Sequence, residues 1–203
     1  MAKDVIPRKT VYRLSVYQRC LQRLKVNDVE RVSSEALAKA AGVKPTQLRK
    51  DLAYFGQFGT RGLGYNISQL SEKLTQVLGT TRLQPVILIG VGNLGSALMS
   101  YQGFNKEGFE IVAGFDIEMP PKITDVPVFP LEKLSGFITE HNIKMAILTV
   151  PARRAQEVVN QIVEAGIQAV LNFTPIILQV PDNVVVNNVD LAIELENLSY
   201  FIR

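Results

Sequence analysis

An apolar run that leads directly into a glycine-rich turn limits the folds open to this chain more than any other feature. Residues 85–89 are continuously apolar, as expected of a parallel strand buried on both faces. Glycines follow at Gly90, Gly92 and Gly95, and a helical pattern continues from there. Gly90 allows a tight turn, Gly92 lets backbone amides approach a pyrophosphate, and Gly95 lets the helix pack closely on the strand. The segment therefore predicts a dinucleotide-binding βαβ unit.

An acidic residue follows the next predicted strand. Residues 110–115 form this strand, and Asp116 ends it. A carboxylate at this position can accept hydrogen bonds from both ribose hydroxyls of an adenosine, and it repels a 2′-phosphate. We therefore expect NADH or NAD⁺ as cofactor rather than NADPH, with an ordinary turn residue as the alternative for Asp116. The expected cofactor contacts in this region are Gly90, Val91, Gly92, Asn93, Leu94, Gly95, Asp116 and Ile117.

The rest of the second half keeps alternating between helix and strand. Helices are expected over residues 131–140 and 152–165, and strands over 145–150, 169–173 and 184–189. This alternation predicts a doubly wound α/β domain with its ligand at the carboxyl ends of the strands. The two loops expected there are mostly apolar and disfavour a charged nicotinamide, so we expect a preference for NADH. They add Thr149, Val150, Pro151, Asn172, Phe173 and Thr174 to the expected contacts.

The two halves of the chain differ in charge. Residues 1–79 carry 14 Lys and Arg against 6 Asp and Glu, a net charge of +8. Residues 80–203 carry 8 against 13, a net charge of −5. A basic domain of this size indicates contact with phosphates, and an ordinary solvated basic surface is the alternative.

The basic half has the pattern of a helix-turn-helix. Residues 10–25 show the apolar spacing of an amphipathic helix, and two short helices are expected over residues 36–41 and 45–54. Gly42 suits the turn between them, and Pro45 suits the first position of the second short helix. We expect this second helix to enter the major groove of DNA.

A glycine-rich segment follows the recognition helix. Residues 57–65 alternate glycines with aromatic and basic residues, which predicts a β-hairpin with Arg61 at its tip, the wing of a winged helix. The alternative is a loop with one solvated arginine. We expect Asp51 to organise a neighbouring arginine rather than to contact DNA. The expected DNA contacts are Lys44, Gln47, Arg49, Lys50, Tyr54, Thr60 and Arg61.

The chain ends in a helix that is apolar on most of its surface. Asp190 is expected to begin it, and we expect it to pack on a partner chain, with packing on its own domain as the alternative. The expected domains are therefore a winged helix over residues 1–79, a nucleotide-binding domain over 80–189 and a dimerisation helix over 190–203.

Several function classes are not expected. The chain has one cysteine, Cys20, and one histidine, His141, so neither a disulfide framework nor a metal site is expected. No acid–base set and no substrate domain accompany the nicotinamide loops, so we expect no catalytic residues. The first residues lack a secretion signal, and the apolar runs are too short to span a bilayer. We therefore expect a cytoplasmic protein that does not contact membranes.

The whole chain resembles the Rex family of redox-sensing transcriptional repressors. This resemblance implies an N-terminal winged-helix domain, a Rossmann-like doubly wound parallel sheet and a domain-swapped C-terminal helix. The motifs that carry it lie at residues 49–52, 54–56, 62–65, 90–95, 148–151, 171–175 and 190–191.

The resemblance also implies a mechanism. A homodimer would bind inverted-repeat operator DNA when NADH is scarce and release it when NADH binds. Arg49 and Lys50 would contact the major groove. Arg19, Tyr101 and Asp190 would form the allosteric switch, in which Asp190 of one subunit pairs with Arg19 or Tyr101 of the other. Tyr101 is expected on the first helix of the nucleotide-binding domain.

Three other functions fit parts of the sequence. An NAD-dependent reductase would oxidise NADH with a small carbonyl compound, and a subunit of a ligase would bind CoA or a nucleotide together with a partner chain. Neither function requires the basic side chains of the first half. A constitutive DNA-binding protein that keeps NAD as a structural cofactor is the third.

Overall fold

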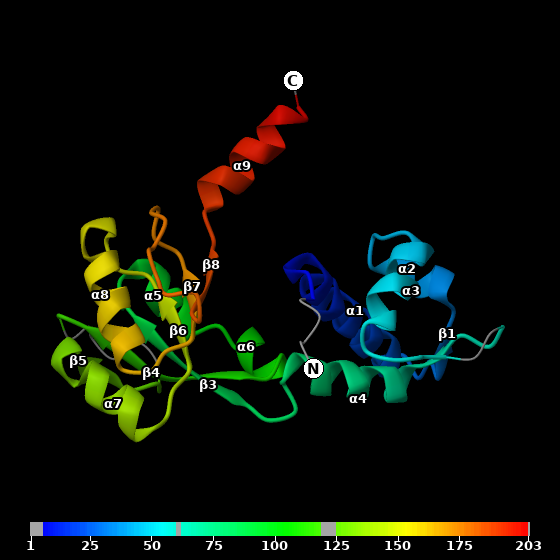
Figure 1. The fold of residues 1–203 in the computed structure, drawn as a ribbon, viewed down its shortest axis with the longest axis horizontal. Coiled ribbons are helices and arrows are strands. Elements are labelled where there is room, and N and C mark those ends of the chain that lie inside the picture. Colours follow the sequence, from blue (N-terminus) through cyan, green and yellow to red (C-terminus); the bar gives the residue numbers. More distant parts are fainter. Residues whose placement is uncertain (1–5, 60–61, 119–124, 203) are drawn as a thin grey trace. The chain divides into compact units, whose positions relative to one another are not determined.

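The computed structural model describes residues 6–59, 62–118 and 125–202, and the chain divides into two compact units, Met1–Arg82 and Leu83–Arg203. The helices of the first unit are α1 (Arg8–Val26), α2 (Ser34–Ala40), α3 (Pro45–Ala53) and α4 (Ile67–Leu78), and its strands are β1 (Arg31–Val32) and β2 (Tyr65–Asn66) (Figure 1). Its core is built from Leu14, Tyr17, Leu21, Leu37, Leu48, Ile67 and Leu74.

Local signals in the sequence set the ends of the short helices. The Ser33 hydroxyl accepts a hydrogen bond from the backbone N–H of Ala36 at 3.0 Å and thereby caps α2. Gly42 takes a φ of +68° in the turn that follows α2, which glycine adopts without strain. Pro45 is the first residue of α3, where its missing N–H leaves no helical bond unmade. The predicted helix-turn-helix is confirmed.

The predicted hairpin lies partly outside the described residues, which lack its tip at Thr60 and Arg61. In the described part, β2 pairs antiparallel with β1, so that Tyr65 lies opposite Val32, and Gly64 directly before β2 forms a β-bridge. Gly64 has a φ of +72°, and a Cβ there would collide with the carbonyl oxygen of Val32. The described partner of β2 therefore comes from the segment before α2, and the pairing expected across the tip of the wing stays a prediction.

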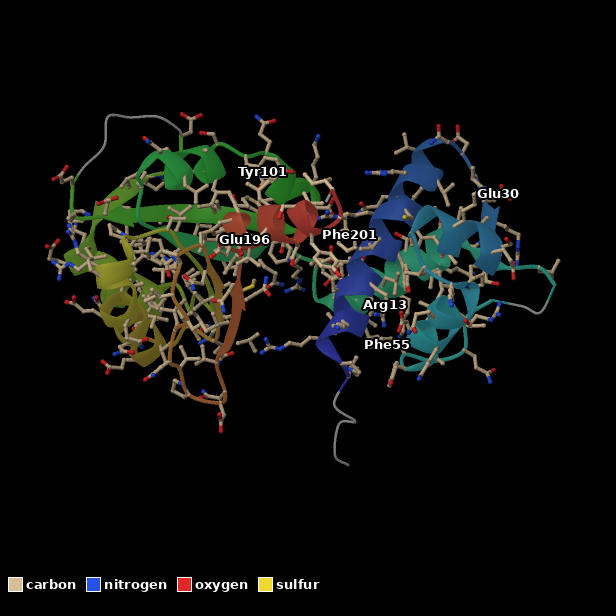
Figure 2. The ribbon with its side chains drawn as sticks, turned by 90° about the horizontal axis from the view of Figure 1, so that it is seen from above. Arg13, Glu30, Phe55, Tyr101, Glu196 and Phe201 are labelled. Atoms are coloured by element: carbon tan, nitrogen blue, oxygen red, sulfur yellow. The ribbon has the colours of Figure 1, made fainter. Side chains whose placement is uncertain are left out.

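Asp51 of α3 joins the recognition helix to α1. Its side chain is fully buried and accepts hydrogen bonds from Arg13 Nε and Nη2 at 2.6 and 2.7 Å. The Tyr17 hydroxyl and the Gln47 amide donate to the same carboxylate at 2.7 and 2.8 Å. Burial by itself raises the pKa of Asp51, but these hydrogen bonds outweigh burial and lower the pKa below its ordinary value. The expectation that Asp51 organises a neighbouring arginine is confirmed, and Arg13 of α1 is labelled in Figure 2.

The second unit is built around a six-stranded parallel sheet of described strands in the order β5-β4-β3-β6-β7-β8. Its strands are β3 (Gln84–Ile89), β4 (Phe109–Asp116), β5 (Val128–Pro130), β6 (Met145–Leu148), β7 (Ala169–Asn172) and β8 (Val185–Asn188). Its helices are α5 (Asn93–Met99), α6 (Gly103–Lys106), the 3₁₀ turn Leu131–Lys133, α7 (Leu134–Glu140), α8 (Ala152–Glu164) and α9 (Leu191–Tyr200).

Helices cover both faces of this sheet. Successive side chains of a strand point to opposite faces. Accordingly, Val86 and Leu88 of β3 cluster with Met99 of α5, whereas Ile87 and Ile89 cluster with side chains of α7 and α8. The strand order runs outward in both directions from β3 and β6, which is the doubly wound arrangement predicted from the sequence.

α9 stands clear of the other elements of its unit (Figure 1). Asp190 caps it by accepting hydrogen bonds from the backbone N–H groups of Ala192 and Ile193 at 2.9 and 3.3 Å. All ten of its residues are exposed to solvent, including Leu191, Ile193, Leu195, Leu198 and Tyr200. An apolar helix in this state is typical of a surface that a partner covers.

Three local expectations differ from the structure. The short strand β5 was not predicted, and the expected helix over residues 131–140 begins as a 3₁₀ turn. Tyr101 lies between α5 and α6 rather than on the first helix of the domain. The reason is that α5 ends at Met99, after which the Tyr101 N–H bonds to the carbonyl of Leu98, only three residues earlier.

We predict that Asp51→Asn destabilises the first unit by about 3 kcal/mol, because it leaves the Arg13 guanidinium without its bidentate partner. Hydrogen exchange of the α1 and α3 amides measures the opening free energy of this unit separately from the second one. Glu72→Gln, an exposed change on α4 in the same unit, is the matched control and should change nothing. Equal protection of both variants would contradict a stabilising role for Asp51.

Protonation of Asp51 at low pH should remove its contribution to the stability of the first unit. Because the pKa of Asp51 is lowered in the folded state, its stabilisation is present above the ordinary carboxyl pKa of about 3.9 and is lost as the pH falls through the lower folded value. The difference in urea midpoint between the wild type and Asp51→Asn should therefore be full at neutral pH and shrink below about pH 4. A difference that grows on acidification would contradict this sign.

Candidate functional site

The carboxyl ends of β3 and β6 lie side by side at the point where the strand order reverses. The Thr149 N–H after β6 donates to the carbonyl of Ile89 at 2.9 Å, and the Thr149 hydroxyl donates to the carbonyl of Gly90 at 2.6 Å. The loop after β6 is thus fixed to the glycine turn after β3. Ligands of doubly wound sheets bind at such a reversal.

The three glycines of the turn have different surroundings. Gly90 has a φ of +98°, and a Cβ on it would lie 2.8 Å from the backbone of Thr149 and Val150. A Cβ on Gly95 would collide with the carbonyl oxygen of Gly90. A Cβ on Gly92, by contrast, would meet no atom within 4 Å. Gly90 and Gly95 are therefore required by the packing of the turn, whereas Gly92 borders open space.

Asp116 is anchored beside this turn. Its Oδ2 accepts a hydrogen bond from the Val91 N–H at 2.5 Å, and its Oδ1 accepts one from the Ile117 N–H at 2.7 Å. These bonds hold the carboxylate at the end of β4, next to the start of α5. Ionised carboxylate oxygens have further lone pairs, so both can also accept a ribose hydroxyl. These two acceptor oxygens fit the ribose hydroxyls in the adenosine half of a dinucleotide.

Hydrogen bonds of the buried Asn172 side chain hold the loop after β7 in place. Asn172 is fully buried; its Oδ1 accepts from the Thr174 N–H and hydroxyl at 3.0 and 2.7 Å, and its amide donates to the carbonyl of Ile176 at 3.0 Å. Two of the predicted contacts, Asn172 and Thr174, therefore shape the loop, while Val150 and Phe173 are half-buried. The other predicted contacts at this edge include the exposed residues Asn93, Leu94, Ile117 and Pro151.

α3 presents basic side chains to solvent. Lys44, Arg49 and Lys50 are exposed, and Tyr54 directly follows the helix. The Arg49 guanidinium donates to the Ser34 hydroxyl at 2.9 Å and lies 3.4 Å from the Glu35 carboxylate. These exposed contacts are weak and can give way to a phosphate or a base.

Gln47, Thr60 and Arg61 are the three remaining predicted DNA contacts. Gln47 donates its amide to Asp51, which orients its side chain on α3. Thr60 and Arg61, at the predicted tip of the wing, lie outside the described residues.

The residues predicted to form the switch lie in both units. Arg19 is exposed on α1, and Asp190 caps α9. Tyr101, which is labelled in Figure 2, is 60% exposed. Its ring packs edge-on against that of Phe104, with 5.1 Å between the ring centroids.

The described residues contain neither a metal-binding cluster nor a helix suited to span a membrane. No group of three or more His, Cys, Asp or Glu side chains there is placed to hold a metal ion. Within the same residues, no helix has the length and apolar character that crossing a membrane requires.

Two family models match parts of the chain. Residues 81–176 match the family described as "CoA binding domain", and residues 5–53 match the family described as "Putative DNA-binding protein N-terminus". The first match lies within the acidic half, residues 80–203, and the second lies within the basic half, residues 1–79.

Curated relatives match nearly the whole chain. The redox-sensing transcriptional repressor Rex of Pelotomaculum thermopropionicum is 48% identical over 96% of this chain and 93% of its own length. The protein with the same name from Carboxydothermus hydrogenoformans is 45% identical over 98% of this chain and 97% of its own length. Both relatives are named as repressors, which agrees with the prediction of a regulator rather than an enzyme.

Solved structures agree with these relatives. A crystal structure of RSP in complex with β-NAD⁺ and operator DNA is 41% identical and has a TM-score of 0.92, covering 98% of this chain and 93% of that chain. A crystal structure of RSP in complex with β-NADH is 39% identical and has a TM-score of 0.87, covering 98% and 94%.

The glycine turn gives a prediction with an internal control. Gly92→Ala should leave the melting temperature unchanged but weaken NADH binding at least tenfold, because its Cβ occupies the open space of the pyrophosphate. Gly95→Ala should instead destabilise the fold, because its Cβ collides with backbone. Thermal unfolding and the fluorescence of bound NADH measure the two effects. Tight NADH binding by a stable Gly92→Ala variant would contradict the assigned cradle.

Proposed function

Because this chain belongs to the Rex family of redox-sensing transcriptional repressors, we propose that it binds operator DNA as a homodimer and releases it on binding NADH. The observation that carries the proposal is the presence of two sites in one chain. One is the basic helix α3 of a helix-turn-helix, and the other is the dinucleotide turn with Asp116. A relative has been solved with NAD⁺ and operator DNA, and also with NADH.

On the DNA side, α3 is the recognition helix. Its exposed Arg49 and Lys50 contact guanine edges or phosphates in the major groove, and Gln47 suits adenine. Lys44 and Tyr54 flank these residues at the two ends of the helix, and Thr60 and Arg61 are the proposed contacts of the wing in the minor groove. Two recognition helices of a dimer read two half-sites of an inverted repeat, about one helical turn apart.

On the nucleotide side, the turn holds the cofactor. Gly92 and the amides of residues 93–95 face the pyrophosphate, and Asp116 accepts the adenosine ribose hydroxyls. The cofactor supplies the redox signal, because its nicotinamide is neutral in NADH and positively charged in NAD⁺. Val150 and Phe173 give the nicotinamide end apolar surroundings that favour the neutral form. No catalytic group is needed for this reading of redox state.

The two sites communicate through the dimer in this proposal. The apolar surface of α9 is covered by the partner subunit as a swapped helix, which explains why its apolar side chains are exposed in one chain. Asp190 at its start then reaches Arg19 or Tyr101 of the partner, depending on the bound nucleotide. We place the protein in the cytoplasm, where the operator DNA and the NADH pool are both found.

Fluorescence anisotropy of a labelled A/T-rich inverted-repeat duplex, at fixed salt, tests this function. We expect NADH to release the DNA at concentrations at which NAD⁺ and CoA do not. A protein that binds DNA but ignores all three ligands would contradict redox sensing and leave the second unit a structural role. Binding no tighter than to unrelated DNA would favour a reductase or a ligase subunit.

The recognition helix gives a further prediction. Lys50→Ala should weaken operator binding. Because one phosphate is no longer neutralised, the negative slope of log affinity against log salt should become shallower by about one. Lys133→Ala, an exposed change of the same type in the second unit, is the matched control. The same assay at several salt concentrations measures both variants. An unchanged salt slope in Lys50→Ala would remove this residue from the DNA interface.

A further inference from the structure

A buried amide links the loop after β7 to the end of β8. Besides its bonds to Thr174 and Ile176, the Asn172 amide donates to Asn188 Oδ1 at 2.9 Å. The exposed fraction of Asn172 is 0%, whereas its partner Asn188 is exposed, so the bond between them runs from a buried amide to the surface of the unit. A buried polar group whose partners are all in place is rigid, and displacing one partner displaces the others.

The partner of this bond lies close to the start of α9. Asn172 and Asn188 are register partners in the parallel ladder of β7 and β8, and the Val189 N–H extends this ladder to the carbonyl of Asn172 at 2.8 Å. Asp190 comes next and caps α9. A single residue therefore separates the side chain bonded to Asn172 from the cap of the helix, without a flexible linker between them.

Packing does not explain why an asparagine stands at position 188. Asparagine is unfavourable within strands, and Asn188 is exposed, so it contributes little apolar burial. Its neighbour Asn187 is also exposed, but its side chain points to the other face of the sheet and forms no hydrogen bond within the described part of the chain. The bond to Asn172 therefore distinguishes Asn188 from its neighbour Asn187.

We propose that Asn188 is a positioning residue that transmits the state of the nicotinamide loop to α9. The inference rests on the proposed function, in which Phe173 of this loop lies beside the nicotinamide and Asp190 belongs to the switch. The backbone ladder sets the spacing of β7 and β8. The side-chain bond adds a second anchor away from the ladder axis, so that a shift of the loop rotates the end of β8 and the first turn of α9 with it.

The coupling factor measures this role. It is the ratio of the operator Kd with saturating NADH to the operator Kd without NADH, determined on the full-length protein by anisotropy. Asn188→Ala should lower this factor about fivefold, the value of one ordinary hydrogen bond. Its affinities for NADH alone and for operator alone should stay within about twofold of the wild type. Asn188→Asp, which keeps the acceptor oxygen, should restore the coupling, and Asn187→Ala should leave it unchanged.

Each outcome has one interpretation. A wild type that does not respond to NADH contradicts the proposed function itself. A responsive wild type with an equally responsive Asn188→Ala variant overturns the role of Asn188 and leaves the proposed function intact. Loss of NADH binding in Asn188→Ala would also overturn it, because the residue would then build the binding site rather than transmit its state.

Discussion

The close approach of the glycine turn to the loop after β6 is the constraint on which the nucleotide site depends. Gly90 can approach the backbone of Thr149 only because it has no Cβ, and the Thr149 hydroxyl then bonds to the Gly90 carbonyl. Gly95 likewise lets α5 approach the Gly90 carbonyl, where a Cβ would collide. The start of α5, the end of β4 and the loop after β6 are thereby held around one space, with its donors oriented before a ligand enters.

The first unit depends instead on a buried carboxylate that is paired with an arginine and surrounded by hydrogen-bond donors. A buried carboxylate is costly unless opposite charge and hydrogen-bond donors surround it. Asp51 has both, from Arg13 and Tyr17 of α1 and from Gln47 of its own helix. The bonds fix α3 against α1 and also orient Gln47, so that stability of this unit and presentation of the recognition helix follow from one network.

The features that the sequence predicts well are those with local causes. The turn at residues 90–95, the cap at Ser33 and the proline at the start of α3 follow from the geometry of individual residue types. The bond of Asp51 to Arg13 spans 38 positions, so the sequence indicates an arginine but does not identify it. Asn188 was missed for a similar reason, because its role depends on the register of β7 against β8. The only local signal for it was an asparagine pair at the end of a strand.

In the proposed function, operator DNA and NADH bind to two linked states of one molecule. Linkage requires that operator DNA weaken NADH binding by the same factor by which NADH weakens operator binding. The most direct test is therefore the Kd of NADH, from its fluorescence, with and without saturating operator duplex. We predict a rise in this Kd that equals the coupling factor measured from the DNA side. An NADH Kd that is unchanged by the operator would contradict linkage between the two sites.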